Sequence, residues 1–363
     1  MKIIVSGGGT GGHIYPALTL IDAVKKKMPN AEFLYVGTKQ GLESDIVPKA
    51  GINFTALSLE GGFERHFTLE NIKRAADAIL SVKRASKIVT EFQPNVVVGT
   101  GGYVCGPVLL AAALMKIPTL IQEQNAVAGI TNKILSKFVN KIAVGTEPAL
   151  KNFPADKTVY TGNPIRSEVL TAFREDGLKE FNFTDEKPVV LVSGGSRGAR
   201  AINNAMIDVL KSAAQKNSAQ FLHVTGKGEF DSVTKKLLDL DAPNIRIVPY
   251  LYNMPTAMAM ADLAIFRAGA TGLAELTARG VPAILIPYPY AAENHQEFNA
   301  RSLVEAGAAK MILNKDLTAE ILSATLEELL ASPEKLKSMA KASLSLGKPN
   351  AADEIADIIL SLN

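Results

Sequence analysis

The sequence predicts an α/β fold made of two doubly wound parallel domains that face a central cleft. Short β-branched or apolar runs alternate with longer helical patterns, which is the rhythm of parallel βαβ units. This rhythm stops in a polar stretch and starts again near residue 189. A chain of 363 residues also exceeds what one hydrophobic core usually holds, so two domains are expected.

Ten predicted strands follow one another, each ahead of a segment with helical periodicity. The first half carries KIIVS, EFLYVG, NVVVGTG, PTLIQEQ and KIAVG, and the second half carries VVLVS, QFLHVTG, IRIVPY, ADLAIFRAG and PAILIPY. The polar segment FREDGLKEFNFTDEKP separates the halves. We therefore expect an N-terminal domain at residues 1–163 and a C-terminal domain at 164–344, with a final helix at about 345–363 packing back on the first domain.

The composition excludes several classes of protein. A net charge of +3 is too small for a nucleic-acid-binding surface, and one cysteine with four histidines suggests neither a disulfide framework nor a zinc cluster. Glycines begin at Gly7, so the N-terminus does not read as a secretory signal, and a cytoplasmic protein is expected. The uncharged run from Val96 to Met115 is broken by glycines and a proline, which favours a strand, a loop and a buried helix over a membrane span.

Three glycine-rich turns follow predicted strands. They are GGGTGGH at 7–13, GTGGYVCGP at 99–107 and SGGSRGA at 193–199. Such turns expose backbone N–H groups at the positive end of a helix dipole, and without Cβ atoms a diphosphate can approach closely. In parallel sheets these turns lie at the carboxyl ends of the strands, where ligands bind. Phosphate-bearing ligands are therefore expected in both domains.

Two of these turns also match other motifs. Gly7, Gly9 and Gly12 satisfy the dinucleotide fingerprint, but the second strand ends in Gly-Thr-Lys instead of the acid that would hold a nicotinamide ribose. The pattern therefore disfavours a dehydrogenase.

A serine hydrolase is a second competing interpretation. Ser196 lies in a G-x-S-x-G pattern, and Asp262 and His295 follow in the order of a hydrolase triad.

The pair Asp239 and Asp241 forms a D-x-D that can hold a metal, although its setting at a helix end favours two solvated carboxylates.

Six motifs taken together resemble one family. In chain order they are GGGTGGHIYPAL, GTGGYVCGP, QEQNAVAGITNK, GNPIR, SGGSRGA and FRAGATGLAEL with PYPYAAENHQEFNA. They resemble the MurG family of N-acetylglucosaminyltransferases, which converts lipid I to lipid II in peptidoglycan synthesis. The resemblance implies a GT-B fold of two Rossmann-like domains. It further implies an acceptor bound mainly by the N-terminal domain, a UDP-N-acetylglucosamine donor bound mainly by the C-terminal one, no cofactor and no bound metal.

The resemblance also carries over site residues. The positions implied for the donor are Thr10, Gly11, Gly12, Asn125, Arg166, Ser196, Leu251, Ala270, Thr271, Gly272, Leu273, Ala274, Glu275, Gln296 and Asn299. Glu275 is the implied ribose ligand, and Gln296 and Asn299 are implied to hold sugar hydroxyls. Gly101, Gly102 and Tyr103 are implied to cradle the acceptor diphosphate. Gly272 departs from the pattern, because family members often carry Ser or Thr there.

The implied reaction is a single inverting displacement. The 4-hydroxyl of N-acetylmuramic acid attacks the anomeric carbon of the donor and expels UDP. A base is needed, and the dipole of the helix that begins after the first turn would keep His13 neutral and able to accept a proton. His13 is the first candidate and Glu123, just past the strand PTLIQ, is the second.

The lipid-linked acceptor implies a peripheral protein on the cytoplasmic side of the cell membrane, bound at the inner leaflet. An apolar stripe at Leu69, Ile72, Ala76 and Ile79 runs beside Lys73, Arg74, Lys83, Arg84 and Lys87, and LMKIP at 114–118 adds a second apolar-basic patch. The alternative is that the stripe packs on the sheet and the charges are solvated. A GT-B enzyme with a soluble acceptor, or a UDP-N-acetylglucosamine epimerase, is the remaining alternative function.

Overall fold

The computed structural model describes residues 1–58, 69–240 and 242–363, with the side chains of helix α3 described from residue 80 onward. The chain divides into two compact units. Unit 1 consists of Met1–Ile165 and Asn350–Asn363, and unit 2 consists of Arg166–Pro349.

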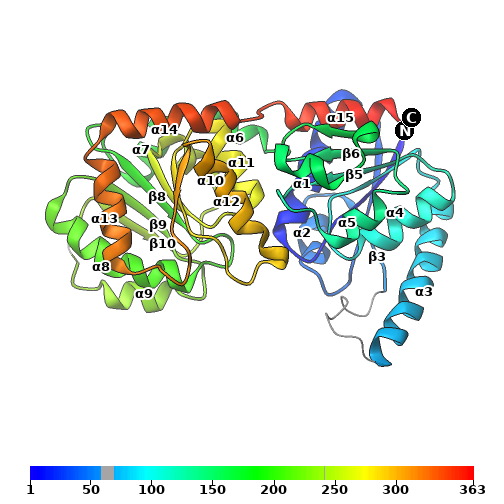
Figure 1. The fold of residues 1–363 in the computed structure, drawn as a ribbon, viewed down its shortest axis with the longest axis horizontal. Coiled ribbons are helices and arrows are strands. Elements are labelled where there is room, and N and C mark those ends of the chain that lie inside the picture. The colour runs from blue at the N-terminus through cyan, green and yellow to red at the C-terminus, as the bar shows by residue number, and fades with distance from the viewer. Residues whose placement is uncertain (59–68, 241) are drawn as a thin grey trace. The chain divides into compact units, whose positions relative to one another are not determined.

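Unit 1 is built on a parallel sheet whose described strands run in the order β3-β2-β1-β4-β5-β6-β7 (Figure 1). The strands are β1 (Lys2–Ser6), β2 (Glu32–Gly37), β3 (Asn53–Ala56), β4 (Val96–Gly99), β5 (Thr119–Glu123), β6 (Lys141–Val144) and β7 (Thr158–Tyr160). The helices are α1 (Gly11–Lys27), α2 (Glu43–Lys49), α3 (Leu69–Phe92), α4 (Cys105–Leu114), α5 (Ile130–Leu135) and α15 (Ala351–Ser361), with 3₁₀ turns at Glu147–Asn152 and Ala155–Lys157.

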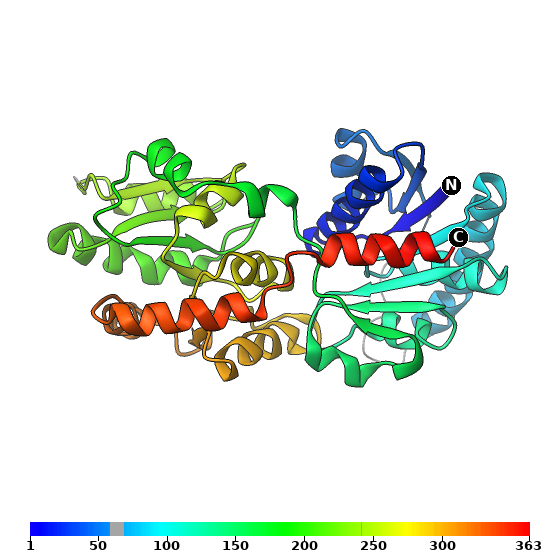
Figure 2. The same ribbon diagram turned by 90° about the horizontal axis from the view of Figure 1, so that it is seen from above.

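The strands of unit 1 are covered on both faces, because successive side chains alternate between two cores. Ile3 and Val5 of β1 pack with α1 and α15 on one face, whereas Ile4 packs with α4 on the other. Figures 1 and 2 show α15 lying along α1, where Ile355 and Ile359 join the same core as Ile14 and Ile21 of α1. The end of the chain therefore completes the first unit.

Unit 2 repeats this design with the described strand order β10-β9-β8-β11-β12-β13. Its strands are β8 (Val189–Ser193), β9 (Gln220–Val224), β10 (Ile245–Val248), β11 (Leu263–Phe266), β12 (Ala283–Leu285) and β13 (Ala309–Met311). Its helices are α6 (Ser167–Thr171), α7 (Arg174–Phe181), α8 (Arg200–Lys216), α9 (Phe230–Lys236), α10 (Met254–Met260), α11 (Ala270–Arg279), α12 (His295–Glu305), α13 (Ala319–Leu330) and α14 (Pro333–Leu346), with a 3₁₀ turn at Ala292–Asn294. These two parallel sheets confirm the predicted α/β class.

The strand orders locate the crevice of each sheet. Strand order reverses between β1 and β4 in unit 1 and between β8 and β11 in unit 2. Ligands in open α/β sheets bind outside the carboxyl ends of the strands at such points. All three glycine-rich turns begin there.

The uncharged run from Val96 is β4, a glycine loop and the buried helix α4, as the sequence predicts. Within the described parts of the chain, no helix combines the length and the hydropathy needed to cross a bilayer.

Candidate active site

The first glycine-rich turn contains glycines partly because neighbouring groups of unit 1 leave no room for a Cβ atom. A Cβ on Gly7 would lie 2.1 Å from the hydroxyl oxygen of Thr100, and one on Gly8 would lie 2.5 Å from a carboxylate oxygen of Glu43. At Gly12, by contrast, a Cβ would meet nothing closer than 3.6 Å. On the sequence alone, the missing Cβ atoms of this whole turn are attributed to the close approach of a ligand. The structure assigns Gly7 and Gly8 to internal packing and leaves open space at the helix start.

His13 lies in the first turn of α1 and is partly exposed. Its Nδ1 is 2.9 Å from the carbonyl oxygen of Gly8, and its own carbonyl oxygen accepts a 2.7 Å hydrogen bond from Thr100. The hydroxyl oxygen of Thr10, which is exposed, lies 3.5 Å from Nδ1. The imidazole is therefore held by the turn that precedes its helix.

The loop after β4 packs directly on this turn. The N–H of Gly8 donates to the carbonyl of Gly101 at 3.3 Å, and a Cβ on Gly102 would lie 2.4 Å from the carbonyl oxygen of Gly8. Gly101 and Gly102 have φ of 104° and 85°, which only glycine adopts readily. Tyr103 remains 39% exposed beside them. The structure thus brings Gly101 next to the imidazole of His13, where a Cβ on this glycine would lie 2.8 Å from the ring, and brings Tyr103 near Gly9.

Cys105 lies under the same loop. Its thiol donates to the carbonyl oxygens of Ser6 and Gly101 at 2.8 and 2.9 Å. Burial raises the pKa of this thiol to about 12, so it is held as an unreactive thiol in the core.

Glu123, the second base candidate, is only 2% exposed at the end of β5. Its carboxylate accepts hydrogen bonds from the N–H of Asn125 at 3.0 Å, the N–H of Gly129 at 3.1 Å and the side-chain amide of Asn132 at 2.9 Å. These donors make Glu123 the organiser of the loop that carries Asn125.

Several buried polar residues of unit 1 were missed by the sequence reasoning. Gln122 donates to Asn163 at 2.9 Å, and Asn163 in turn donates to the carbonyl of Gln124 at 3.0 Å. Asn163 belongs to the GNPIR motif, which was the available signal. Glu43, described below, was also missed.

The glycine-rich turn of unit 2, residues 194–199, is called the second turn below, and its surroundings differ from those of the turn at 7–13. Ser196 and its neighbours Gly195 and Arg197 are exposed, and α8 begins just after them. A Cβ on Gly198 would lie 2.0 Å from the carbonyl oxygen of Thr225, so the base of the turn packs tightly against the loop after β9. The tip is left as open backbone at a helix N-terminus.

Arg166 and Glu275 form an ion pair that spans 109 residues of sequence within unit 2. Nε and Nη2 of Arg166 lie 3.0 and 2.9 Å from Oε1 of Glu275. Burial raises the pKa of Glu275, which is 5% exposed, while the guanidinium of Arg166 opposes that shift. The sequence assigned each residue to the donor but did not foresee that they pair.

The remaining donor candidates surround the carboxyl ends of β11 and β12. Asn299, 2% exposed, donates to the carbonyl of Ala268 at 3.2 Å, and the side chain of Gln296 accepts from the N–H of Tyr288 at 2.9 Å. Within α11, the hydroxyl oxygen of Thr271 is buried and has no hydrogen-bond partner among the described residues. The other members of this group are Ala270, Gly272, Leu273 and Ala274 on α11 and the partly buried Leu251 after β10.

Arg267 is a further residue that the sequence reasoning missed. Its guanidinium donates to the carbonyls of Ile286 and Pro287 at 3.1 and 2.9 Å and lies over the ring of Tyr288. Its backbone N–H bonds Ser193. Arg267 therefore ties the ends of β8, β11 and β12 together at the crevice.

The hydrolase interpretation is wrong. Asp262 precedes β11 and its N–H bonds the carbonyl of Val189, at the amino edge of the sheet, whereas Ser196 follows the carboxyl end of β8. Strands of four to five residues place these two side chains on opposite edges, roughly 13 Å or more apart. The carboxylate of Asp262 is moreover bonded by Arg174 and by the N–H of Val189.

Within the described residues, no group of three or more His, Cys, Asp or Glu side chains is arranged to hold a metal ion. Asp239 is exposed, and Asp241 lies outside the described residues.

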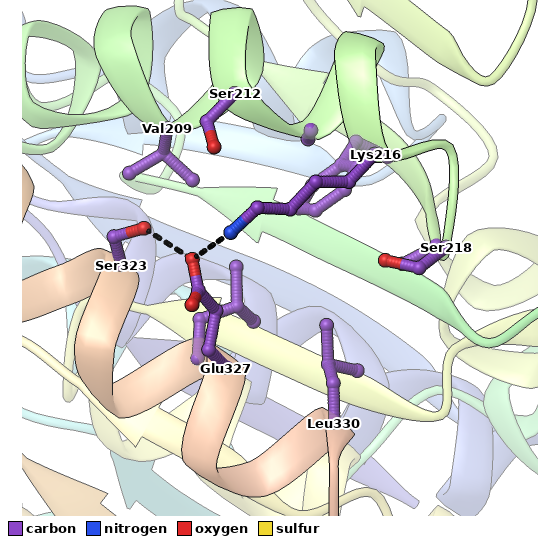
Figure 3. Close-up of a pocket in the computed structure, with 11 residues that line it drawn as sticks. Val209, Ser212, Lys216, Ser218, Ser323, Glu327 and Leu330 are labelled. Carbon is purple, nitrogen blue, oxygen red and sulfur yellow. Dashed lines mark hydrogen bonds and ion pairs between the residues drawn. The ribbon is translucent and has the colours of Figure 1, made fainter.

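One small depression lies away from these crevices. Figure 3 shows it between α8 and α13, where Lys216 and Ser323 both contact the carboxylate of Glu327 at 2.6 and 3.0 Å. Its volume of about 30 Å³ has room for roughly one water molecule. It borders the end of α8 and the start of β9, so it belongs to the amino edge of the sheet and not to the site.

Comparisons with known proteins give the relatives of this chain. The glycosyltransferase family 28 N-terminal domain matches residues 3–144, and the glycosyltransferase family 28 C-terminal domain matches residues 189–355. The UDP-N-acetylglucosamine–N-acetylmuramyl-(pentapeptide) pyrophosphoryl-undecaprenol N-acetylglucosamine transferase of Bacillus cytotoxicus is 48% identical over 363 residues, which cover 100% of this chain and 99% of the relative. A protein of the same name from Thermoanaerobacter sp. is 47% identical over 367 residues and is covered completely, as is this chain.

Solved structures agree on the fold. MurG from Acinetobacter baumannii matches with a TM-score of 0.81 and 29% identity over 99% of both chains. A UDP-GlcNAc 2-epimerase from Neisseria meningitidis, bound to UDP-GlcNAc, matches with a TM-score of 0.69 and 17% identity, over 99% of this chain and 100% of that chain. The second likeness concerns the fold alone. Together they confirm the GT-B-like architecture.

Proposed function

This chain belongs to the MurG family of N-acetylglucosaminyltransferases, within glycosyltransferase family 28, and from that premise we propose that it transfers N-acetylglucosamine from UDP-N-acetylglucosamine to lipid I, giving lipid II for peptidoglycan synthesis. The observation that carries this proposal is the 48% identity over the full length to a transferase of that name. The enzyme class is a hexosyltransferase.

The donor is proposed to bind at the switch point of unit 2. Oε1 of Glu275 receives both bonds from Arg166, so Oε2 is the oxygen proposed to accept from the ribose hydroxyls. The open turn at 194–198 leads into α8, whose N-terminus favours the diphosphate, and Ser196 is exposed there. Gln296 and Asn299 flank the same strand ends and are proposed to hold the sugar hydroxyls.

The acceptor is proposed to bind at the switch point of unit 1. The loop of Gly101, Gly102 and Tyr103 packs on the turn that holds His13 and is proposed to cradle the acceptor diphosphate. Gly11 and Gly12 at the start of α1 remain, with Thr10 and Asn125, positions proposed for the donor sugar. His13 is proposed as the base, because its ring is held at Nδ1 and a second ring nitrogen remains. Glu123 is proposed to position Asn125, because its carboxylate already accepts hydrogen bonds from Asn125, Gly129 and Asn132.

The reaction follows from these roles. His13 removes the proton of the 4-hydroxyl of N-acetylmuramic acid as that oxygen bonds to the anomeric carbon. The bond from the anomeric carbon to UDP breaks, and UDP leaves with the electron pair. Backbone N–H groups of the second turn and the side chain of Arg166 are proposed to stabilise the charge that develops on the diphosphate.

A peripheral association with the cytoplasmic face of the membrane is proposed for unit 1. Leu114 at the end of α4 is 66% exposed, and Ile130, Ile134 and Phe138 on and after the adjoining α5 are 63%, 59% and 51% exposed. Exposed lysines stand among them at positions 116, 133 and 137. Exposed apolar side chains ringed by cations suit an anionic lipid surface. The side chains of the stripe at 69–79 lie outside the described residues.

The test is substrate turnover. With UDP-N-acetylglucosamine and a short-chain lipid I analogue, the expected product is the disaccharide of lipid II, formed with one UDP per transfer. Release of UDP in the absence of acceptor, or exchange at the donor C2 position, would instead support the epimerase alternative. Turnover of a lipid-free acceptor at equal kcat/KM would support the soluble-acceptor alternative.

A further inference from the structure

A buried carboxylate lies beneath the first glycine-rich turn. Glu43, the first residue of α2, is 0% exposed. One of its oxygens accepts from the N–H and the hydroxyl of Thr38 at 2.9 and 2.7 Å, and the other accepts from the N–H of Gly9 at 3.1 Å. Three donors therefore converge on one side chain at the end of β2.

The donors keep this carboxylate ionised. Burial acts to raise the pKa of Glu43, but the hydrogen bonds from Thr38 and Gly9 outweigh burial and hold the pKa below its ordinary range. Among the described residues Glu43 forms no ion pair, so its charge is met by backbone and hydroxyl dipoles.

The Gly8–Gly9 peptide joins Glu43 to His13. In a trans peptide the C=O and N–H point in opposite directions within one plane. Here the N–H of Gly9 points to Oε2 of Glu43 at 3.1 Å, and the C=O of Gly8 points to Nδ1 of His13 at 2.9 Å. A carboxylate bound at one end of this peptide therefore orients and polarises the carbonyl at the other end.

The carbonyl contact determines the tautomer of His13. A carbonyl oxygen cannot donate, so a 2.9 Å contact with Nδ1 requires a proton on Nδ1. The neutral ring then carries its lone pair on Nε2. A hydrogen bond accepted by Nδ1 from the Thr10 hydroxyl, 3.5 Å away, would leave the Gly8 carbonyl facing a lone pair.

The surrounding contacts hold this peptide in place. The hydroxyl of Tyr35 donates to the carbonyl of Gly7 at 2.8 Å, and the N–H of Gly8 bonds Gly101. Gly9 has φ of 83°, and a side chain on Gly8 would displace the carboxylate of Glu43. The bare residues at 8 and 9 are thus what lets a carboxylate reach the peptide.

We propose that Glu43 is a positioning residue for the transfer reaction, acting through the Gly8–Gly9 peptide to fix His13 as the Nδ1–H tautomer with Nε2 free to accept the acceptor's proton. The inference rests on the proposed function, in which His13 is the base. In the reaction Nε2 takes the proton of the attacking hydroxyl, Nδ1 keeps its own proton, and Glu43 stays ionised and takes none. The positive charge on the ring is then stabilised by the oriented carbonyl of Gly8.

The first experiment observes the ring of His13 directly. Nitrogen-15 NMR of histidine-labelled protein distinguishes protonated from bare ring nitrogens, and loss of a signal set in His13→Ala assigns it among the four histidines. The expected wild-type result is a protonated Nδ1 and a bare Nε2. A protonated Nε2 would overturn the proposal, and this result needs no variant of Glu43 to fold.

The second experiment removes the charge. In Glu43→Gln the side chain is neutral and keeps one acceptor oxygen, so the N–H of Gly9 loses either its hydrogen-bond partner or the negative charge that polarises the peptide. We expect the Nδ1–H tautomer to lose population and kcat to fall by about 10- to 100-fold, the range found when a metal-ligating histidine loses the group that orients it. The donor KM is expected to stay within about twofold, because unit 2 is untouched.

Asp45→Asn is the matched control. Asp45 lies on the same helix, but it is exposed and, among the described residues, forms an ion pair with the exposed Lys49. The control should leave both the tautomer and kcat unchanged. An unchanged tautomer in a folded Glu43→Gln protein overturns the role of Glu43. An unchanged kcat in His13→Ala instead overturns the base assignment, so the two failures are read from different experiments.

Discussion

Two of the three glycine-rich turns, the one that opens unit 1 and the one that follows β8 in unit 2, have similar sequences but different surroundings. The turn at 7–12 is half-buried, and Glu43, Tyr35 and Thr100 bond it or the first turn of α1 behind it. The turn at 194–198 exposes its tip, and its backbone at Gly195 bonds only the hydroxyl of Ser193 among the side chains described. A turn held by side chains suits a residue that must be aimed, whereas an open turn suits an anion that is recognised by backbone. The two crevices are therefore expected to respond differently to mutation.

The largest effect is expected in the first crevice. His13→Ala should lower kcat by roughly 10²- to 10⁴-fold, the usual worth of a general base, with little change in donor KM. Steady-state kinetics with both substrates varied measures this. A rise in acceptor KM with kcat preserved would show that His13 only positions the acceptor.

The second crevice should instead lose donor affinity. Glu275→Ala removes a carboxylate proposed to accept from ribose hydroxyls, and such charge-assisted bonds are worth about 1.5 to 3 kcal/mol each, or roughly 10- to 150-fold in donor KM. Titration with UDP, monitored by calorimetry, checks the loss without turnover. Unchanged UDP affinity would remove Glu275 from the donor site.

Much of this comparison was accessible from the sequence. Strands such as KIIVS and VVLVS are apolar throughout and stand directly before the glycines, so the parallel sheets and the places of both turns were predicted and are confirmed. In the structure Ile3 and Ile4 lie in two different cores, which explains why a strand that is buried on both faces is apolar throughout.

The polar partners were not accessible, because they come from distant segments. Glu43 reaches Gly9 across 34 positions and Arg166 reaches Glu275 across 109, and no local periodicity marks either contact. The second strand was judged to lack an acid at its end. In fact α2 supplies one there, bonded to Thr38 and Gly9 inside the protein.

A smaller effect on the donor KM, visible mainly in its pH dependence, is expected from Arg166→Ala, whereas loss of the proposed contact between Arg166 and the diphosphate would appear separately in kcat. Burial already raises the pKa of Glu275, and Arg166 is the cation that counters it, so removing Arg166 moves the pKa further up. Donor binding that needs the carboxylate should then weaken as the pH falls through the raised value. As the pH is lowered, the donor KM of the variant should therefore begin to rise at a higher pH than that of the wild type, which a series of KM measurements across the pH range of enzyme stability checks.

The pH dependence of the stability of the fold has the opposite sign to that of donor binding. A folded pKa above the unfolded value of about 4.3 means that the fold prefers the neutral acid, so stability is lost as the pH rises through the interval between the two values. The melting temperature of Arg166→Ala should therefore fall further below that of the wild type at pH 8 than at pH 5. Equal differences at both values would show that Arg166 does not govern the charge of Glu275.

The smallest effect should come from Ser196→Ala, because an open turn recognises its anion mainly through backbone. Ser196 is exposed, and its hydroxyl is proposed to add one hydrogen bond to a diphosphate already held by N–H groups and the dipole of α8. One such bond is worth about 0.5 to 1.5 kcal/mol, or roughly 2- to 12-fold in donor KM, with kcat nearly unchanged. A fluorophosphonate probe, which labels activated serines, should leave the wild type unlabelled, since Asp262 lies at the other edge of the sheet. A loss in kcat as large as that of His13→Ala would mean that the second turn, like the first, aims a reacting group, and the contrast between the two crevices would be lost.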